Sequence, residues 1–487
     1  MRALAAAAGA LLLSAVPSAQ AGGTEDAFAR LMRINRASLV ALAEGELVPR
    51  ALASRIAEGI ERIEAEQAAP DAPRSGDYLE FEARLLELAG PAASRLHTGR
   101  SRQDIGSTSR RLALRAGLLE AYDAQLGARA ALLALAADHT ATLVPGYTHG
   151  VQAQPTTLGH VLMAFASAFE RDAARLEQAY ARVDRSPLGA AVLSTSGFPL
   201  DRRRLAELVG FGGVIENAFD ANLVASVDSK IEVASVLATS AVHVGQLVEN
   251  LHTQYHAPAP WVLLSDAKTS GSSIMPQKRN PRPLDALRRY ATSVVGGAHT
   301  VTLFAHNTSS GMHDYRDATQ VLSVCSDARA MYALYAEVVA SLHVDAERAR
   351  REVEADYATM TEVADVLLRD ADVPFRIGHG YASRLTDLGR RTGRRPKDLT
   401  AAELTQTYRE VTGAELPLDV ERLQRALDPR AMVLGRRGLG GTQPEETARM
   451  LASHGERLAA ARTWLATARE RIATADAQLR EAFAALR

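Results

Sequence analysis

Three long helical stretches in the middle of the chain restrict the folds that it can adopt. Apolar residues recur three and four positions apart over residues 155–184, 220–256 and 282–305, which is the spacing of one face of an α-helix. At ~1.5 Å per residue, the first two stretches would each be about 45 to 55 Å long. Helices of this length must bury long apolar stripes against each other or against other copies of the chain. The sequence therefore predicts a helix bundle that assembles into an oligomer.

The remaining sequence is also helical in pattern, so we expect an all-α protein. Alternating Val, Ile and Thr runs, which are typical of strands, are hard to find. Proline and glycine interrupt the helical pattern near residues 141–148 and again at residues 373–375. These breaks predict an N-terminal helical domain (22–145), a central long-helix bundle that carries the catalytic loop (146–372) and a C-terminal helical region (373–487).

The first 21 residues have the layout of a secretory signal peptide. Met1 and Arg2 are followed by an apolar run over residues 3–16 and by small residues that resemble a cleavage site. This pattern predicts a mature protein that starts at Gly22 and is periplasmic or secreted. The alternative is a misassigned start or a helical extension, which would leave the protein in the cytoplasm.

Charge and cysteine content exclude several classes of partner. The net charge of the chain is -1, so we expect neither a nucleic-acid partner nor a membrane partner. The single Cys325 cannot form an internal disulfide, and no Cys/His cluster has the spacing of a metal site. We therefore expect no metal and no cofactor.

Residues 271–281 read Gly-Ser-Ser-Ile-Met-Pro-Gln-Lys-Arg-Asn-Pro and are the most informative motif of the chain. One glycine, two serines and two prolines predict an ordered loop. The loop combines a serine that could act as a base, a lysine cation and an asparagine amide, so it is suited to a reaction that develops negative charge. The alternative is an ordinary surface turn rich in serine and proline.

Two other motifs precede this loop. Residues 97–104 read His-Thr-Gly-Arg-Ser-Arg-Gln-Asp, and their hydroxyl and guanidinium groups are suited to binding carboxylates. For Ser101 the alternative role is a helix cap, and for Arg102 it is a surface ion pair. Residues 146–149 read Gly-Tyr-Thr-His, and Ala-Gln-Pro follows at residues 153–155.

Together the three motifs resemble, in the same order, the signature blocks of the argininosuccinate lyase family, within the aspartase/fumarase superfamily. Weaker similarity extends the resemblance over most of residues 35–450. The resemblance implies three mostly helical domains, with the long helices of four subunits forming a twenty-helix core. It also implies a homotetramer whose active sites are shared between subunits.

The resemblance implies a lyase that cleaves a C–N bond of an N-substituted aspartate, a dicarboxylate substrate, to release fumarate and an amine. Such an enzyme must remove a weakly acidic carbon proton and stabilise the dianion that forms. The family implies that Ser272 is the base, with Ser273 as the alternative. Lys278 and Asn280 would stabilise the developing charge.

A second group of residues would handle the leaving amine and the substrate carboxylates. His149 is a candidate for proton transfer to the amine, directly or through water; the alternative is a structural histidine. We expect substrate contacts from Ser101, Arg102, Gln103, Thr148 and Gln154.

The sequence does not determine which amine leaves the substrate. Argininosuccinate, which gives arginine and fumarate, is the leading substrate, and another N-succinyl amino compound is the alternative. Gln103 stands where the family usually has Asn, Val151 and Gln152 replace polar and basic residues, and Met312 stands at a tyrosine position. A catalytically silent helical oligomer with a binding or structural role is the alternative from a different class.

Overall fold

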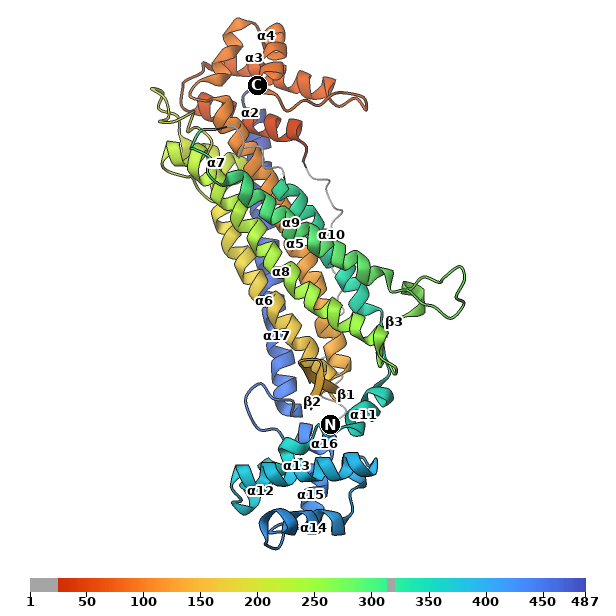
Figure 1. Ribbon diagram of the computed structural model, residues 1–487. Helices are drawn as coiled ribbons and strands as arrows, with labels where there is room; N and C mark the ends of the chain where they lie inside the picture. Colours follow the sequence, from red (N-terminus) through yellow and green to blue (C-terminus); the bar gives the residue numbers. More distant parts are fainter. Residues whose placement is uncertain (1–24, 313–319) are drawn as a thin grey trace.

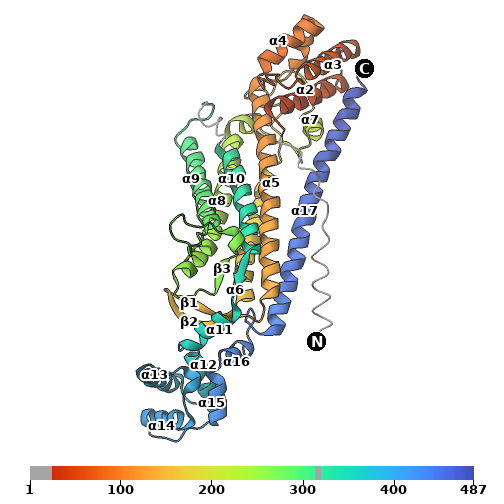
Figure 2. The ribbon, with the colours of Figure 1, turned by 90° about the vertical axis from the view of Figure 1, so that its right-hand side faces the viewer.

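The computed structural model describes residues 25–312 and 320–487 and forms an elongated, mostly helical molecule. A long helix bundle occupies the middle, and a smaller group of helices lies at each end (Figures 1 and 2). This architecture confirms the predicted all-α class. The predicted signal peptide, residues 1–21, lies outside the described residues.

Long helices from distant parts of the sequence make up the central bundle. They are α5 (Arg102–Asp138), α6 (Leu158–Val183), α8 (Ala225–His256), α9 (Arg282–Ala305), α10 (Gln320–Ala340) and α17 (Pro444–Ala484). One hydrophobic core runs between them and includes the buried side chains of Leu118, Leu162, Leu237, Leu287 and Leu465. The long apolar stripes predicted from the sequence are partly buried here, while Val224, Val242 and Leu303 are 49%, 54% and 72% exposed.

Two of the predicted helical stretches form helices that begin at or close to the predicted residue. Helix α9 covers the predicted residues 282–305, with Pro283 in the first turn, where the missing N–H has no intrahelical partner to lose. Helix α6 begins at Leu158, three residues later than predicted, because the residues before it pair in a strand.

The third predicted stretch, Asp220–His256, begins with a short π-helix, η2 (Asp220–Val224), and continues as α8. Among the described residues, it is the one helical stretch that is long and apolar enough to cross a membrane by length and composition. Its apolar residues Val233, Leu237 and Val244 are fully buried in the bundle core. Packing in the bundle core accounts for these three residues, while 44% of the apolar window as a whole is buried inside the chain.

A second hydrophobic core lies at the end of the bundle where α5 begins. Its helices are α2 (Ala27–Glu44), α3 (Arg50–Glu66), α4 (Tyr78–Ala89), η1 (Pro91–His97) and α7 (Arg202–Val209). Leu479 and Phe483, near the end of α17, also belong to this core. The C-terminal helix therefore joins the N-terminal helices to the bundle.

The opposite end of the molecule carries short helices from residues 346–434. They are α11 (Ala346–Ala355), α12 (Met360–Ala371), α13 (Phe375–Thr392), η4 (Pro396–Asp398), α14 (Ala401–Thr412), α15 (Val420–Ala426) and α16 (Pro429–Leu434). Helices α12 to α15 share a third hydrophobic core. The break predicted at residues 373–375 separates α12 from α13.

Two small antiparallel sheets interrupt the helical pattern. Strands β1 (Leu143–Thr148) and β2 (Val151–Thr157) form a hairpin, with Leu143 opposite Thr157 and Thr148 opposite Val151. Strands β3 (Val262–Leu264) and β4 (Leu342–Val344) pair near the far end of α8. The sequence pattern did not predict either sheet, although it did predict the break in the helical sequence at β1.

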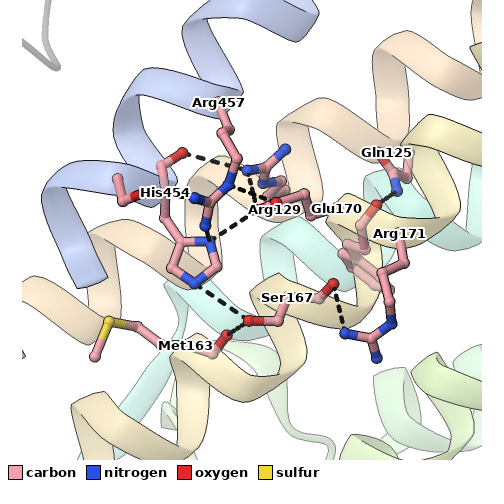
Figure 3. Close-up of polar contacts among 10 residues, drawn as sticks. Gln125, Arg129, Met163, Ser167, Glu170, Arg171, His454 and Arg457 are labelled. Atoms are coloured by element: carbon pink, nitrogen blue, oxygen red, sulfur yellow. Dashed lines mark hydrogen bonds and ion pairs between the residues drawn. The ribbon is translucent and has the colours of Figure 1, made fainter. Parts of the chain in front are cut away.

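A polar cluster attaches α17 to α5 and α6 (Figure 3). Glu170 of α6 accepts hydrogen bonds from Arg129 Nη2 at 2.8 Å and from His454 Nδ1 at 3.0 Å, and it also pairs with Arg457. His454 Nε2 lies 3.2 Å from Ser167 Oγ. The Arg129 side chain is only 1% exposed, so Glu170 compensates a buried charge. Contacts of this kind fix the register of α17 along the bundle.

The three hydrophobic cores do not correspond to three consecutive segments of the chain. Helix α5 belongs to the predicted N-terminal domain and α17 to the predicted C-terminal region, yet both pack in the central bundle. The domain boundaries placed at residues 145/146 and 372/373 therefore stay a prediction.

Candidate active site

Residues 271–281 form an exposed loop between η3 (Asp266–Lys268) and α9. The backbones of Ser270 and Asn280 close its base, because each N–H donates to the carbonyl oxygen of the other residue, at 3.0 and 2.8 Å. The Asn280 side-chain amide donates to the carbonyl oxygens of Ser270 at 3.1 Å and Gly271 at 3.3 Å. Figure 1 shows the loop standing out from the side of the bundle near β3. The predicted loop is ordered at its base by its own backbone.

Ser272 lies near the start of this loop, and its hydroxyl faces the loop backbone. Its Oγ accepts the backbone N–H groups of Ile274 at 3.4 Å and Met275 at 3.2 Å. Hydrogen bonds to an oxygen favour its negatively charged form. Residues 271–281 contain no Asp or Glu, and Lys278 and Arg279 add positive charge. The surroundings of Ser272 therefore favour an anion.

Ser101, Arg102 and Gln103 lie at the start of α5. Ser101 is the N-cap, and its Oγ accepts the backbone N–H of Gln103 at 3.1 Å. The helix-cap role considered for Ser101 is therefore present. The cap uses a lone pair of Oγ, so it leaves the hydroxyl hydrogen for a ligand. Arg102 is exposed beside it, and a helix N-terminus attracts anions.

Thr148 and His149 lie at the tip of the β1–β2 hairpin. His149 has φ +53° and Gly150 has φ +75°, and they form the two-residue turn between the paired residues Thr148 and Val151. Two consecutive positive φ angles are typical of a type I′ turn, in which the first residue is usually Asn, Asp or Gly. The turn presents the His149 side chain to solvent at the end of a rigid hairpin.

The hairpin is braced by α11, which lies about 200 positions later in the sequence. The Tyr147 hydroxyl donates to the Glu352 carboxylate, and Gln152 Nε2 donates to the Val353 carbonyl oxygen at 3.3 Å. Gln154 is exposed on β2, opposite Gly146. The brace fixes the direction in which the tip of the hairpin points.

In a single chain these candidate residues form three separate groups. Helix α5 has 37 residues and so spans about 55 Å. Ser101 lies before its first turn, and His149 lies beyond its last turn. The loop that carries Ser272 projects from the side of the bundle (Figures 1 and 2). One chain therefore does not bring the three groups together.

A large cavity in the described part of the chain lies away from these three groups. It has a volume of about 790 Å³, lies between α7 and α17 and is lined by residues that include Arg203 and Arg471. Within residues 25–312 and 320–487, no group of three or more His, Cys, Asp or Glu side chains could hold a metal ion. Met312 is 51% exposed, and the rest of the aligned segment, residues 313–315, lies outside the described residues.

Two buried residues near the start of α5 have no role predicted from the sequence. Asp104 and Asn222 are both 0% exposed, and both bind the turn at residues 189–192. Asp104 belongs to the 97–104 motif, where its place in the first turn of a helix was a usable signal. Asn222 has no comparable signal, because its role depends on the π-helix η2 in which it lies.

The fold and the three motif-bearing groups define a class of helical lyases. The sequence matches a family model described as "Lyase" over residues 34–296 and one described as "Argininosuccinate lyase C-terminal" over residues 357–434. Among solved structures, EDDS lyase in complex with formate has a TM-score of 0.85 at 28% identity, covering 94% of this chain and 92% of that one. Fumarate lyase from Mesorhizobium sp. BNC1 has a TM-score of 0.65 at 20% identity and shows the shared fold.

Curated relatives narrow this class to one family. Argininosuccinate lyase from Methanoculleus marisnigri is 38% identical over 389 residues, which are 79% of this chain and 77% of that protein. Argininosuccinate lyase 2 from Agrobacterium fabrum is 33% identical over 93% of this chain and 91% of that protein. The chain belongs to the argininosuccinate lyase family of the aspartase/fumarase superfamily, and it is a carbon–nitrogen lyase.

Proposed function

We propose that the chain eliminates an amine from an N-substituted aspartate and releases fumarate, with Ser272 as the base. The observation that carries this role is the surroundings of the Ser272 hydroxyl. Two backbone N–H groups donate to Oγ, and the loop carries cations and no carboxylates. Both features lower the free energy of an alkoxide.

The proposed reaction has two stages. The Ser272 alkoxide first takes a proton from the carbon next to a substrate carboxylate, which leaves a dianion with its charge on that carboxylate. The electron pair then forms the C=C bond of fumarate while the C–N bond breaks. His149 gives a proton to the departing nitrogen, directly or through water, and solvent restores both side chains.

Lys278 is the cation proposed to stabilise the dianion. Asn280 does not have a free amide for the dianion in this conformation, because its amide donates to the carbonyl oxygens of Ser270 and Gly271 in the same loop. In this conformation Asn280 holds the two ends of the loop together. A contact with substrate requires its side chain to rotate. Loops of this kind often close over a substrate.

Binding of the substrate carboxylates is proposed for the first turn of α5 and for the hairpin. Ser101, Arg102 and Gln103 would supply hydroxyl, guanidinium and amide donors at a helix N-terminus. Thr148 and Gln154 would supply donors from the hairpin. These donors suit a dicarboxylate and need no metal ion.

Argininosuccinate is the proposed substrate, supported by the curated relatives that carry this activity in their names. A second candidate is another N-succinyl amino compound. Two observations favour it: Gln103 Nε2 points to the Asn222 carbonyl oxygen at 3.5 Å, and the structural neighbours include EDDS lyase. Buried polar contacts discriminate strongly between amines, so altered donors would change the preferred one.

The substrate can be identified by following fumarate absorbance with argininosuccinate and a panel of N-succinyl amino acids and diamines. We expect at least one to release fumarate in equal amounts with its amine. A preference for argininosuccinate supports the first candidate, and a preference for another adduct supports the second. No fumarate from any of them would refute the proposed function.

We also propose that the enzyme is a homotetramer with shared active sites. The separation of the three candidate groups in one chain supports this, because the chemistry needs them together. The molar mass in solution, measured by light scattering, tests the assembly. A monomer that releases fumarate would contradict it.

The proposed location is the periplasm or the exterior of the cell, supported by the signal-like pattern of residues 1–21. N-terminal sequencing of the protein from its host tests this. A mature chain that starts at Gly22 is the expected result, and one that retains Met1 would contradict it.

A further inference from the structure

A buried carboxylate joins the proposed substrate-binding turn to a distant loop. Asp104 is 0% exposed. Its Oδ1 accepts the backbone N–H of Ser101 at 2.8 Å and that of Ile105 at 3.0 Å. Its Oδ2 accepts the N–H of Gly189 at 2.9 Å and that of Ala191 at 3.1 Å. One side chain therefore fixes the start of α5 and, 85 positions later, a turn between α6 and α7.

The turn that Asp104 holds has an unusual backbone. Gly189 has φ +79°, and Ala191 has φ +52°. A residue with a Cβ rarely adopts a positive φ, and the conformation persists only where the surroundings impose it. The two N–H donors that face Asp104 belong to these two residues, so the carboxylate stabilises the left-handed conformation directly.

Asn222 holds the same turn from the opposite side. It lies in the π-helix η2 and is 0% exposed. Its Nδ2 donates to the carbonyl oxygens of Ala191 at 2.9 Å and Val192 at 3.2 Å. The backbone of residues 189–192 is therefore held between two buried side chains, one from α5 and one from η2. π-Helical turns are often found at functional sites.

The held segment continues into contact with the 97–104 motif. Gly99 has φ +70°, and a Cβ placed on it would lie 3.3 Å from Ser196 Oγ and 3.2 Å from the Leu200 side chain. Gly99 stands two residues before Ser101. The loop after residue 192 therefore packs against the turn that precedes the proposed carboxylate-binding residues.

We infer that Asp104 is a positioning residue for substrate: through Ser101 and the 189–192 turn, it fixes the arrangement in which Ser101 and Arg102 meet a substrate carboxylate. Asn222 completes the arrangement from the other side. This inference rests on the proposed role of Ser101 and Arg102 in binding. In this proposal, Asp104 itself does not contact the substrate and does not transfer a proton.

Protonation of Asp104 would weaken the arrangement. Burial raises the pKa of Asp104 to about 6, although the backbone N–H donors and Arg100 act in the opposite direction. Arg100, in the segment before α5, and Arg202 of α7 are the charged groups that face it. A protonated carboxyl carries an O–H in place of one acceptor, so it can no longer accept all four N–H groups.

Loss of affinity and loss of folding have opposite pH dependence for this group. Because the pKa of Asp104 in the folded chain lies above its ordinary value of 3.8, uptake of this proton as the pH falls favours the folded state. Weaker binding below about pH 6 would therefore come from the displaced binding turn and not from unfolding at this position.

The test measures fumarate binding to the full-length protein by isothermal titration calorimetry at pH 8 and pH 5.5. In the wild type we expect the Kd for fumarate to rise at the lower pH. In Asp104→Asn we expect a Kd at least about tenfold higher at pH 8, because an amide leaves buried N–H groups without an acceptor, and a smaller change between the two pH values. With a turned-over substrate, KM should rise by a similar factor while kcat changes less than about threefold.

Asp184→Asn is the matched control. Asp184 is also buried, accepts the Gly212 N–H at 3.1 Å and pairs with Arg115 at 3.1 Å. This variant should lower the melting temperature and leave the Kd for fumarate unchanged. If Asp104→Asn does not fold, Asn222→Ala removes the other half of the arrangement and should also raise the Kd.

A folded Asp104→Asn variant with a wild-type Kd at both pH values would overturn the inference. If that variant is unfolded, an unchanged Kd in Asn222→Ala would overturn it. A wild-type protein that binds no fumarate would instead refute the proposed function, so the two failures are distinguishable.

Discussion

His149 combines a proposed chemical role with a constrained backbone. Its φ of +53° places it in the left-handed region, where asparagine is better tolerated than most residues. A change to alanine would alter both the proton-transfer group and the turn. The sequence motif identified the residue, but its turn position depends on the pairing of β1 with β2.

We expect His149→Asn to keep the hairpin and to lower kcat by about 10²- to 10⁴-fold, the usual contribution of a general acid. Asparagine preserves the backbone preference but cannot supply a proton. Steady-state kinetics of fumarate release measure kcat, and circular dichroism confirms the fold. The control is His160→Asn, on α6. A kcat within threefold of the wild type in His149→Asn would contradict the proposed proton donor.

Some residues of the candidate site are predictable from sequence motifs, but their contacts are not. The motifs predict roles for Ser272, Lys278 and Asn280, which lie on one loop, and these roles stay a prediction. The sequence could not show that the Asn280 amide donates to its own loop. It also could not show that Asp104 reaches Gly189, because a contact across 85 positions depends on tertiary structure.

At the scale of elements, the helices were predictable and the hairpin was not. Helix α9 was predicted to the residue because an apolar stripe and a proline in the first turn mark it. Strands β1 and β2 contain Pro145, Gly146 and Pro155, which are poor strand formers. Contacts with α11, about 200 positions away, support their pairing. The local sequence pattern cannot predict those contacts.

The attachment of α17 to the bundle should depend on pH. Burial lowers the pKa of His454, Glu170 raises it, and Arg457 and Arg129 lower it further. Since the net shift is downward, the unfolded chain binds this proton more readily. The contribution of His454 to stability should therefore be complete above about pH 6.5 and decrease as the pH falls, by at most about 1.4 kcal/mol per pH unit.

Urea unfolding between pH 8 and pH 5 measures this contribution. The unfolding free energy of the wild type should decrease more steeply below pH 6.5 than that of His454→Gln. His379→Gln, a change at an exposed histidine of α13, should keep the wild-type slope. Equal slopes for the wild type and His454→Gln would show that this cluster does not couple protonation to folding.

At the scale of the whole molecule, the sequence indicated a helix bundle, and the resemblance indicated its family. Neither showed that α17 returns along the bundle to join the N-terminal core. The three candidate groups lie at the start of α5, beyond its end and on a lateral loop (Figure 1). Their separation supports the proposal that the complete site is formed by more than one chain.

Mixing two impaired variants tests the proposed shared site. Arg102→Ala and His149→Asn alter groups at opposite ends of α5. If each site takes these groups from different chains, co-expressed subunits should form some sites with neither change, and activity should reappear. The kcat/KM of the mixture should exceed that of either variant by at least about tenfold. Activity no higher than the sum of the two variants would contradict shared sites.

The most direct measurement compares fumarate release by Ser272→Ala and Ser273→Ala with that of the wild type, on the substrate identified from the panel. The account predicts that Ser272→Ala loses at least about 10³-fold in kcat, because the base is removed, while Ser273→Ala loses less than tenfold. Wild-type turnover that survives in Ser272→Ala would contradict Ser272 as the base. A wild-type protein that releases no fumarate from any N-succinyl compound would contradict the elimination itself.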